Sequence, residues 1–285
     1  MKIGRYWTKR RAEAVTPSGK LVAVIAYGWS LLSREEAVRR ADESARRAAA
    51  RIAAGEPFPR GYDYADRPAR EEVVEEFKGD GGEPVAAVTR NSYGSLVLNT
   101  KDLMFIDVDL PPEDAGGQLL KSIKRLFGAE TEDAETRTRK KIEAAAASRP
   151  EYTFRLYRTA AGFRCAVVNR RVSPDSPESR RLLEEFGADP LYVKLCQSQR
   201  SYRARLTPKY WRCMMHRPPS RFPWETLEEE QSYRAWEREY EERCGRFAAC
   251  RFVGQFGAQE GDAELRMLVD LHDRYTKADS NLELA

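Results

Sequence analysis

Apolar positions are scattered among polar ones in residues 4–15, and the longest apolar run of the chain, at 21–27, lies within residues 20–29. Both ranges have the length and pattern of strands, which predicts two strands joined by a turn at 16–19. Small apolar residues then recur with helical spacing between Ala37 and Ile52, which predicts a helix over 33–54. Ser33 and Glu36 form a capping box at its start, so we expect Ser33 to accept the Glu36 amide and Glu36 to bond back.

Along the rest of the chain, predicted helices and strands alternate irregularly. Helices are predicted at 69–77, 121–147, 177–186, 190–197, 224–243 and 262–277, and strands at 84–91, 95–99, 103–110, 152–157, 163–169, 202–206 and 247–256. This order, with its hairpins, predicts an α+β fold with a mostly antiparallel sheet and packed helices. We expect an N-terminal α/β unit at 1–78, a core at 84–221 and a C-terminal part at 222–285.

Composition narrows the class of protein. The 285 residues are 41% hydrophobic and 33% charged, which is typical of a soluble globular chain with an ample core. No apolar run is long enough to cross a membrane, and the first residues lack a signal-peptide pattern, so we expect a cytoplasmic protein. Five cysteines without a CxxC pair argue against a disulfide scaffold or zinc finger. With two histidines, of which His272 is interpreted as structural or solvent-facing, a bound metal would need oxygen ligands.

The charges are unevenly distributed although the net charge is only +4. Residues 151–221 hold 15 Lys and Arg against 6 Asp and Glu, whereas residues 222–245 hold 3 against 8. The first segment is suited to a polyanion, and the acidic helix at 224–243 is a candidate site for a protein partner. The arginines also fit a solvated surface in an Arg-rich chain.

The sharpest local feature is the sequence MFIDVDL at 104–110. On a strand, Asp107 and Asp109 share one face, while Ile106, Val108 and Leu110 form the opposite, buried face. Two carboxylates on one side of a rigid strand suit Mg²⁺ or Mn²⁺, which prefer oxygen ligands. The alternative is an ordinary amphipathic strand with one wet face.

A second feature is a turn of small residues between two arginines, RTAAGFR at 158–164. Thr159 and Gly162 leave room for a phosphate to approach backbone amides, and Arg158 and Arg164 would bind it through charged hydrogen bonds. An ordinary hairpin turn is the alternative.

The third feature is the basic sequence YRARLTPKYWR at 202–212. Arg203 and Arg205 share a strand face, and Lys209 and Arg212 follow. Tyr210 and Trp211 offer surfaces on which a base could stack. A surface strand without such a role is equally compatible with the pattern.

Together the three features resemble the archaeo-eukaryotic primase superfamily over residues 84–212. That family places an hhhDhD strand, here 104–109, against an sGxGxH loop and strand, here 159–167. A third Asp and a basic RxPGxxxxK-like stretch follow, here Asp189 and residues 203–209. Arg164 stands where the family has its histidine.

The resemblance implies an RRM-like catalytic half and a primase-polymerase nucleotidyltransferase that uses nucleoside triphosphates and nucleic acid in DNA replication or repair. It implies Asp107, Asp109 and Asp189 as ligands of Mg²⁺ or Mn²⁺, the first two being catalytic. The implied phosphate-binding residues are Arg158, Thr159, Gly162, Arg164, Arg203, Arg205 and Lys209. Two alternatives stay open: a non-catalytic nucleic-acid-binding module on the same fold, and an interaction protein that docks a partner through its acidic helix.

Overall fold

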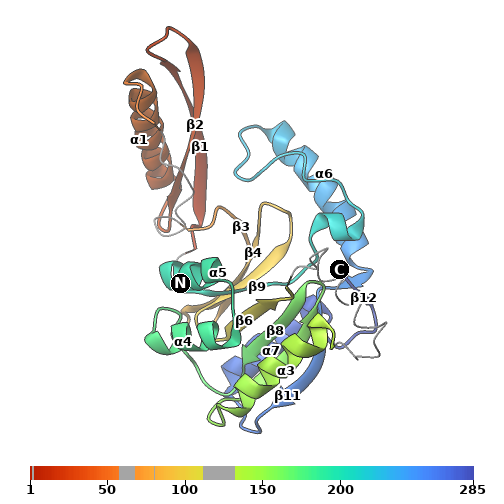
Figure 1. Cartoon of the computed structure of the whole chain (residues 1–285). Coiled ribbons are helices and arrows are strands. Elements are labelled where there is room, and N and C mark those ends of the chain that lie inside the picture. The colour runs from red at the N-terminus through yellow and green to blue at the C-terminus, as the bar shows by residue number, and fades with distance from the viewer. Residues whose placement is uncertain (2, 58–67, 80, 112–131) are drawn as a thin grey trace, which may run out of the picture.

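The computed structural model describes residues 1, 3–57, 68–79, 81–111 and 132–285. These residues form an α+β protein with six α-helices and several antiparallel sheets, as the order of elements predicted. Two four-stranded sheets make up the centre of the molecule, from which the N-terminal hairpin extends at the upper left and helix α6 at the upper right of Figure 1. Within the described residues, no helix combines the length and the apolar character needed to cross a membrane.

The N-terminal unit is a hairpin of β1 (Tyr6–Val15) and β2 (Leu21–Ser30), covered by helix α1 (Arg34–Ala53). Ala37, Ala41 and Ala45 are buried on the face that meets the hairpin, as their spacing predicted. A Cβ on Gly28 would lie 2.0 Å from the Ala37 carbonyl oxygen, so α1 can approach β2 this closely only above glycine.

The cap of α1 matches half of its prediction. Ser33 Oγ accepts the Glu36 amide at 3.2 Å. The Glu36 carboxylate, however, accepts hydrogen bonds from Ser30 Oγ and from Arg40 Nη2. The capping box predicted that this carboxylate accepts the Ser33 amide, but Ser30 and Arg40 occupy it. The Ser33 amide donates to Ser30 Oγ instead.

The first central sheet has the order β3-β4-β5-β9, with β3 (Glu72–Lys78), β4 (Pro84–Arg90), β5 (Leu96–Thr100) and β9 (Tyr202–Arg205). The prediction of a helix at 69–77 is wrong, because residues 72–78 form the edge strand β3. Its glutamates, which favour a helix locally, pair with distant groups: Glu72 with Arg234, Glu75 with Tyr275 and Glu76 with Arg5. Tertiary contacts therefore override the local propensity.

The second central sheet has the order β11-β7-β8-β6, with β6 (Met104–Asp109), β7 (Phe154–Thr159), β8 (Gly162–Val167) and β11 (Cys250–Phe256). Helix α3 (Ala134–Ala147) precedes β7 along the chain, and β8 lies between β6 and β7 in the split β-α-β arrangement. Of the helix predicted at 121–147, residues 121–131 lie outside the described residues.

Helices α4 (Pro177–Phe186), α5 (Pro190–Gln199) and α7 (Ala263–Thr276) bury their apolar residues in the main core. Strands β3 and β11 complete the two central sheets, although they lie in the ranges predicted for the N-terminal and C-terminal parts. The strand predicted at 247–256 is interrupted at Ala249: β10 (Phe247–Ala248) pairs in parallel with β12 (Glu283–Leu284), and β11 continues into the central sheet.

Helix α6 (Leu227–Cys244) and the short 3₁₀ helix η1 (Tyr210–Cys213) form a second, smaller core. The aromatic face of α6 is buried there, through Tyr233, Trp236 and Tyr240. On its acidic side, Glu237 and Glu241 pair with the buried Arg90 at 2.6 and 2.7 Å. The aromatic stripe of this helix is therefore used within the chain.

Candidate active site

A cavity of about 320 Å³ lies where the two central sheets meet, beside β6, the β7–β8 turn and the chain after β9. Six of the ten residues singled out in the sequence line it: Asp107, Asp109, Thr159, Arg164, Arg205 and Lys209. The three sequence features, separated by up to about a hundred residues, therefore converge on one place. We call this cavity the junction pocket.

The acidic side of the junction pocket comes from strand β6. Asp107 is half-buried and Asp109 is exposed, while Ile106 and Val108 are buried on the opposite face, as the alternation predicted. In the antiparallel pairing with β8, Asp107 lies opposite Arg164 and Asp109 opposite Gly162. The register therefore sets a cation directly across from the first carboxylate.

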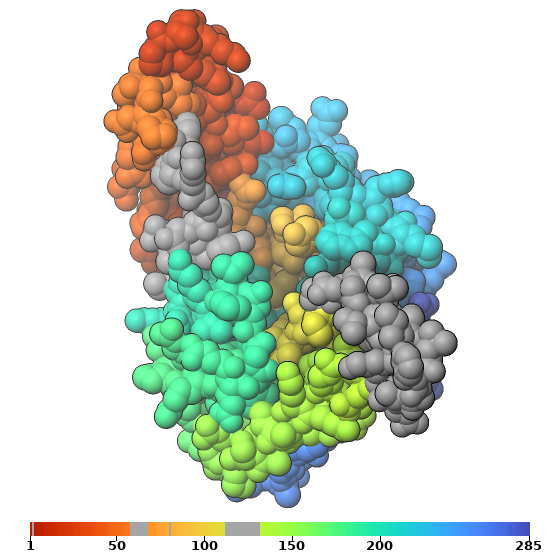
Figure 2. Space-filling view, in the orientation of Figure 1, coloured from red at the N-terminus to blue at the C-terminus, as the bar shows by residue number. Residues whose placement is uncertain are grey.

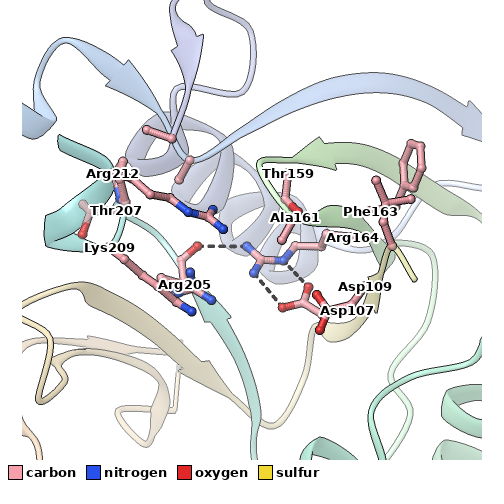
Figure 3. A pocket seen from close by; sticks show the side chains of 14 residues that line it. Asp107, Asp109, Thr159, Ala161, Phe163, Arg164, Arg205, Thr207, Lys209 and Arg212 are labelled. Carbon is pink, nitrogen blue, oxygen red and sulfur yellow. Dashed lines mark hydrogen bonds and ion pairs between the residues drawn. The ribbon is translucent and has the colours of Figure 1, made fainter. Parts of the chain in front are cut away.

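Arg164 uses all three of its guanidinium nitrogens within the protein (Figure 3). Nε and Nη2 donate to the two oxygens of Asp107 at 2.6 and 2.9 Å, and Nη1 donates to the Arg205 carbonyl oxygen at 2.9 Å. The side chain is almost completely buried, and although burial opposes its charge, Asp107 raises the pKa of Arg164. Arg164 therefore joins β8 to both β6 and β9.

His272 and Asp273 support Arg164 from helix α7. His272 is fully buried, with Nδ1 2.8 Å from Asp273 Oδ1 and Nε2 3.3 Å from Arg164 Nη1. Burial lowers the pKa of His272, and these partners suit a neutral ring that donates from Nδ1 and accepts at Nε2. The sequence signal was a polar His-Asp pair on the apolar side of the last helix. Periodicity did not connect that pair to the strands.

The basic side of the junction pocket holds cations that lack acidic partners. Arg205, Lys209 and Arg212 all line the pocket, and no acidic side chain in the described part of the chain forms an ion pair with them. Burial, and then the neighbouring cations, lower the pKa of Arg205 and that of Lys209. An anion bound here would relieve this repulsion. Arg212, which lies on η1 one helical turn after Lys209, belongs to the basic sequence at 202–212 but was not among the residues assigned to phosphate binding.

The small-residue turn at 158–164 sets how closely the strands that form the junction pocket approach one another. A Cβ on Gly162 would lie 2.1 Å from the Val108 carbonyl oxygen, so glycine permits the close approach of β8 to β6. Thr159 lines the pocket and accepts the Gly162 amide on its hydroxyl at 3.1 Å. Arg158 is not among the described lining residues, because its guanidinium pairs with Glu135 at 2.8 and 2.9 Å.

Arg203 and Asp189 lie elsewhere. Arg203 pairs with Glu71 at 2.6 Å and lines a separate, larger cavity. Asp189 is the N-cap of α5, where its carboxylate accepts the amides of Leu191 and Tyr192. The Asp-Pro sequence explains this, since Asp is a favoured N-cap and proline a favoured first residue. Among the described residues, no group of three or more His, Cys, Asp or Glu side chains is arranged to hold a metal ion.

Two carboxylates still fit a divalent ion that a substrate completes. Magnesium is commonly held by one or two carboxylates together with substrate phosphates and waters. Asp109 is exposed at the pocket and has no described ion-pair partner, and the Asp107 oxygens that accept from Arg164 retain further lone pairs. Asp107 and Asp109 thus suit a metal that arrives with phosphate rather than a preformed metal centre.

Comparison with known proteins assigns no role to the chain. No protein-family model matches the chain, and no curated protein and no solved structure matches it significantly. The functional assignment therefore depends on how carboxylates and unpartnered cations share the junction pocket.

Proposed function

We propose that the protein is a divalent-metal-dependent nucleotidyltransferase of the primase-polymerase type, which binds a nucleoside triphosphate in the junction pocket and acts with nucleic acid. The observation that carries this proposal is the composition of the pocket: two carboxylates on one strand face three cations that pair with no acidic side chain among the described residues. The split β-α-β arrangement of the sheet that holds Asp107 and Asp109 supports an RRM-like catalytic half.

Each side of the junction pocket has a role in this proposal. Arg205, Lys209 and Arg212 bind the triphosphate, since no acidic side chain in the described part of the chain forms an ion pair with them. Asp107 and Asp109 would hold Mg²⁺ or Mn²⁺, which when bound neutralises phosphate charge. Arg164 fixes the orientation of Asp107, and His272 in turn accepts a hydrogen bond from Arg164.

The test measures nucleotide binding by calorimetry with and without Mn²⁺, and nucleotide incorporation on a primed template. Asp109→Asn removes one carboxylate charge at nearly constant shape, and Asp270→Asn, at an exposed position of α7, is the matched control. We expect Asp109→Asn to weaken metal-dependent nucleotide binding by about tenfold or more and to abolish incorporation. Equal behaviour of the two variants would contradict the proposal.

A non-catalytic phosphate-binding module is the second candidate. It is favoured by the bidentate Asp107–Arg164 pair, which engages both oxygens of one carboxylate, and by the absence of a three-ligand cluster among the described residues. This candidate predicts salt-sensitive nucleotide binding that is independent of metal and unchanged in Asp109→Asn, with no nucleotide incorporation. The same calorimetry therefore separates the two functions.

A further inference from the structure

A second cavity, of about 570 Å³, lies between the N-terminal hairpin and the first central sheet. Its described lining includes Trp7 and Tyr27 of the hairpin, and Arg70, Tyr93 and Arg221 of the central region. We call it the hairpin groove. In the space-filling view, the surface is hollowed where the gold strands lie between the orange-red N-terminal unit and the blue segment around α6 (Figure 2).

Ion pairs tie the hairpin across this groove. Arg5 pairs with Glu76 of β3 at 2.7 Å, and Lys9 pairs with Glu225 at 3.0 Å, four residues after Arg221. The hairpin is thus connected both to the central sheet and to the segment that carries Arg221. These contacts connect the two sides of the groove.

The hairpin groove carries a surplus of positive charge. Its acidic lining residue, Glu71, is already paired with Arg203 at 2.6 Å, and both side chains are nearly buried. Arg70 and Arg221 form no ion pair with any described acidic residue. Arg70 lies with its guanidinium 3.8 Å from the centroid of the Tyr27 ring. Charge complementarity therefore favours an anionic occupant.

Flat groups suited to stacking accompany these cations. The Asn91 side chain accepts the amides of Tyr93 and Ser95, which holds Tyr93 at the β4–β5 turn with 45% of its surface exposed. Tyr93 meets Trp211 edge to face at 5.4 Å. Lys209 of the junction pocket lies 5.0 Å from the Trp211 ring centroid and 5.9 Å from that of Tyr93. Tyr93 therefore lines the hairpin groove, and the Tyr93–Trp211 pair contacts Lys209 of the junction pocket.

We propose that the hairpin groove binds single-stranded nucleic acid, with bases stacked on Tyr93 and on the Arg70–Tyr27 pair and a phosphate on Arg221. Alternating cations and flat groups match the repeating phosphates and bases of such a strand, and unpaired bases are the ones free to stack. The inference rests on the proposed function, because it names the site of the nucleic acid on which the enzyme acts. It needs neither metal nor nucleotide.

The test is fluorescence anisotropy of a labelled oligodeoxythymidine of about 12 nucleotides, within the site sizes usual for such grooves. It uses the full chain in EDTA without nucleotide. We expect Tyr93→Ala and Arg221→Ala each to weaken binding roughly tenfold. Arg221→Ala should also lower the salt slope of the binding constant by about 0.7. Tyr6→Ala on the opposite strand face and the exposed Arg246→Ala are matched controls, and both should bind as wild type does.

Failure of this inference is distinguishable from failure of the proposed function. Asp109→Asn should bind the oligonucleotide as tightly as wild type does, because the groove does not use the carboxylates. Absence of single-strand binding by the wild type overturns the groove, whatever the metal-dependent nucleotide binding shows. Equal binding by wild type, Tyr93→Ala and Arg221→Ala overturns it as well.

A different observation concerns two buried thiols. Cys213 at the end of η1 and Cys244 at the end of α6 have their sulfurs 3.1 Å apart in the second core. The hydrogen bond from Cys213 lowers the pKa of Cys244 against the effect of burial, and that bond and burial raise the pKa of Cys213. Cys244 is therefore the better nucleophile, and Cys213 donates the hydrogen bond to it.

The geometry also points to a reversible Cys213–Cys244 disulfide formed by a peroxide. The Cys244 thiolate attacks one peroxide oxygen and releases water once the leaving oxygen is protonated. Cys213 then displaces a second water from the resulting sulfenic acid. In sum, two thiols and hydrogen peroxide give one disulfide and two waters. The bond would link η1, which carries Arg212 of the junction pocket, covalently to α6.

Intact mass and thiol counting after hydrogen peroxide test this step. We expect a loss of about two mass units and of two of the five alkylatable thiols in denaturant, reversed by dithiothreitol. Cys213→Ser should prevent the reversible loss, and Cys250→Ser, a buried cysteine in the main core, should not. An unchanged thiol count in the wild type, or the same loss in Cys213→Ser, would overturn the inference.

Discussion

Each central sheet holds an arginine–carboxylate pair, and the two pairs differ in what surrounds them. Arg203 and Glu71 border the hairpin groove but keep only 12% and 9% of their side chains exposed, because protein groups hold them: Asn99 accepts from Arg203, and Glu71 accepts from the hydroxyl of Thr89. Arg164 is more deeply buried, with 4% of its side chain exposed, but its partner Asp107 is 35% exposed and faces the junction pocket. We call Arg203–Glu71 the closed pair, because protein groups occupy it and its carboxylate is nearly buried, and Asp107–Arg164 the open pair, because its carboxylate is exposed to a ligand.

The difference shows how the same pair of residue types acquires different uses. In the closed pair every charge is balanced within the sheet, so the pair serves packing. In the open pair a second carboxylate, Asp109, stands beside Asp107, and unpartnered cations lie across the cavity. We therefore expect changes to the closed pair to affect stability and changes around the open pair to affect binding.

The largest expected effect is on stability, from Arg203→Met. The substitution leaves Glu71 as a buried charge without its partner, which costs about 3 kcal/mol. Urea unfolding followed by circular dichroism measures the change. The double variant Arg203→Met/Glu71→Gln should recover part of the loss, because it also removes the stranded charge. A loss below about 1 kcal/mol in the single variant would mean that the pair is not closed.

Arg205→Ala tests the open side of the comparison. It removes an unpartnered cation, so the free energy of unfolding should change by less than about 1 kcal/mol. Nucleotide affinity should fall roughly tenfold, because a charged hydrogen bond to phosphate is lost. Calorimetry and urea unfolding of the same preparation measure both quantities.

The exposed Arg217→Ala is the matched control for Arg205→Ala and should leave both quantities unchanged. If Arg205→Ala destabilised the protein without weakening nucleotide binding, Arg205 would belong with Arg203 as a packing residue. That result would remove one cation from the proposed triphosphate site.

Local pattern predicted most elements and the faces of the site strands. Alternation placed Asp107 and Asp109 on one face, and helical spacing placed Ala37, Ala41 and Ala45 against the hairpin. The error at 69–77 arose where the partners that decide the structure come from elsewhere in the chain. Nothing in a Glu-Val-Val-Glu-Glu sequence shows that Arg5, Arg234 and Tyr275 will pair with it.

The same limit applies to the junction pocket. The sequence identified the carboxylates, the turn and the basic strand, but the bidentate Asp107–Arg164 pair depends on cross-strand register. His272 lies 108 positions after Arg164, and its contact depends on how α7 packs. Asp189 shows the reverse case: Asp followed by proline is also a helix N-cap signal, and its carboxylate serves that local role.

The smallest effect concerns His272 and the pH dependence of stability. Burial lowers the pKa of His272 below its ordinary value of 6.5, so the unfolded chain binds its proton more tightly than the folded protein does. Stability from this residue is therefore complete above about pH 6.5 and is lost as the pH falls from there toward the lowered value. Urea unfolding at several pH values between about 7.5 and 5 measures the slope.

His272→Gln removes the titrating ring, so the dependence of the unfolding free energy on pH should lose the contribution of about one proton. His216→Gln, at an exposed position, is the control and should leave that dependence as in wild type. Because His272 contacts Arg164, which orients Asp107, acidification should also weaken metal-dependent nucleotide binding in wild type more than in His272→Gln. Identical slopes in wild type and His272→Gln would show that the ring does not change its charge on unfolding. His272 would then not make the Asp107–Arg164 pair sensitive to pH.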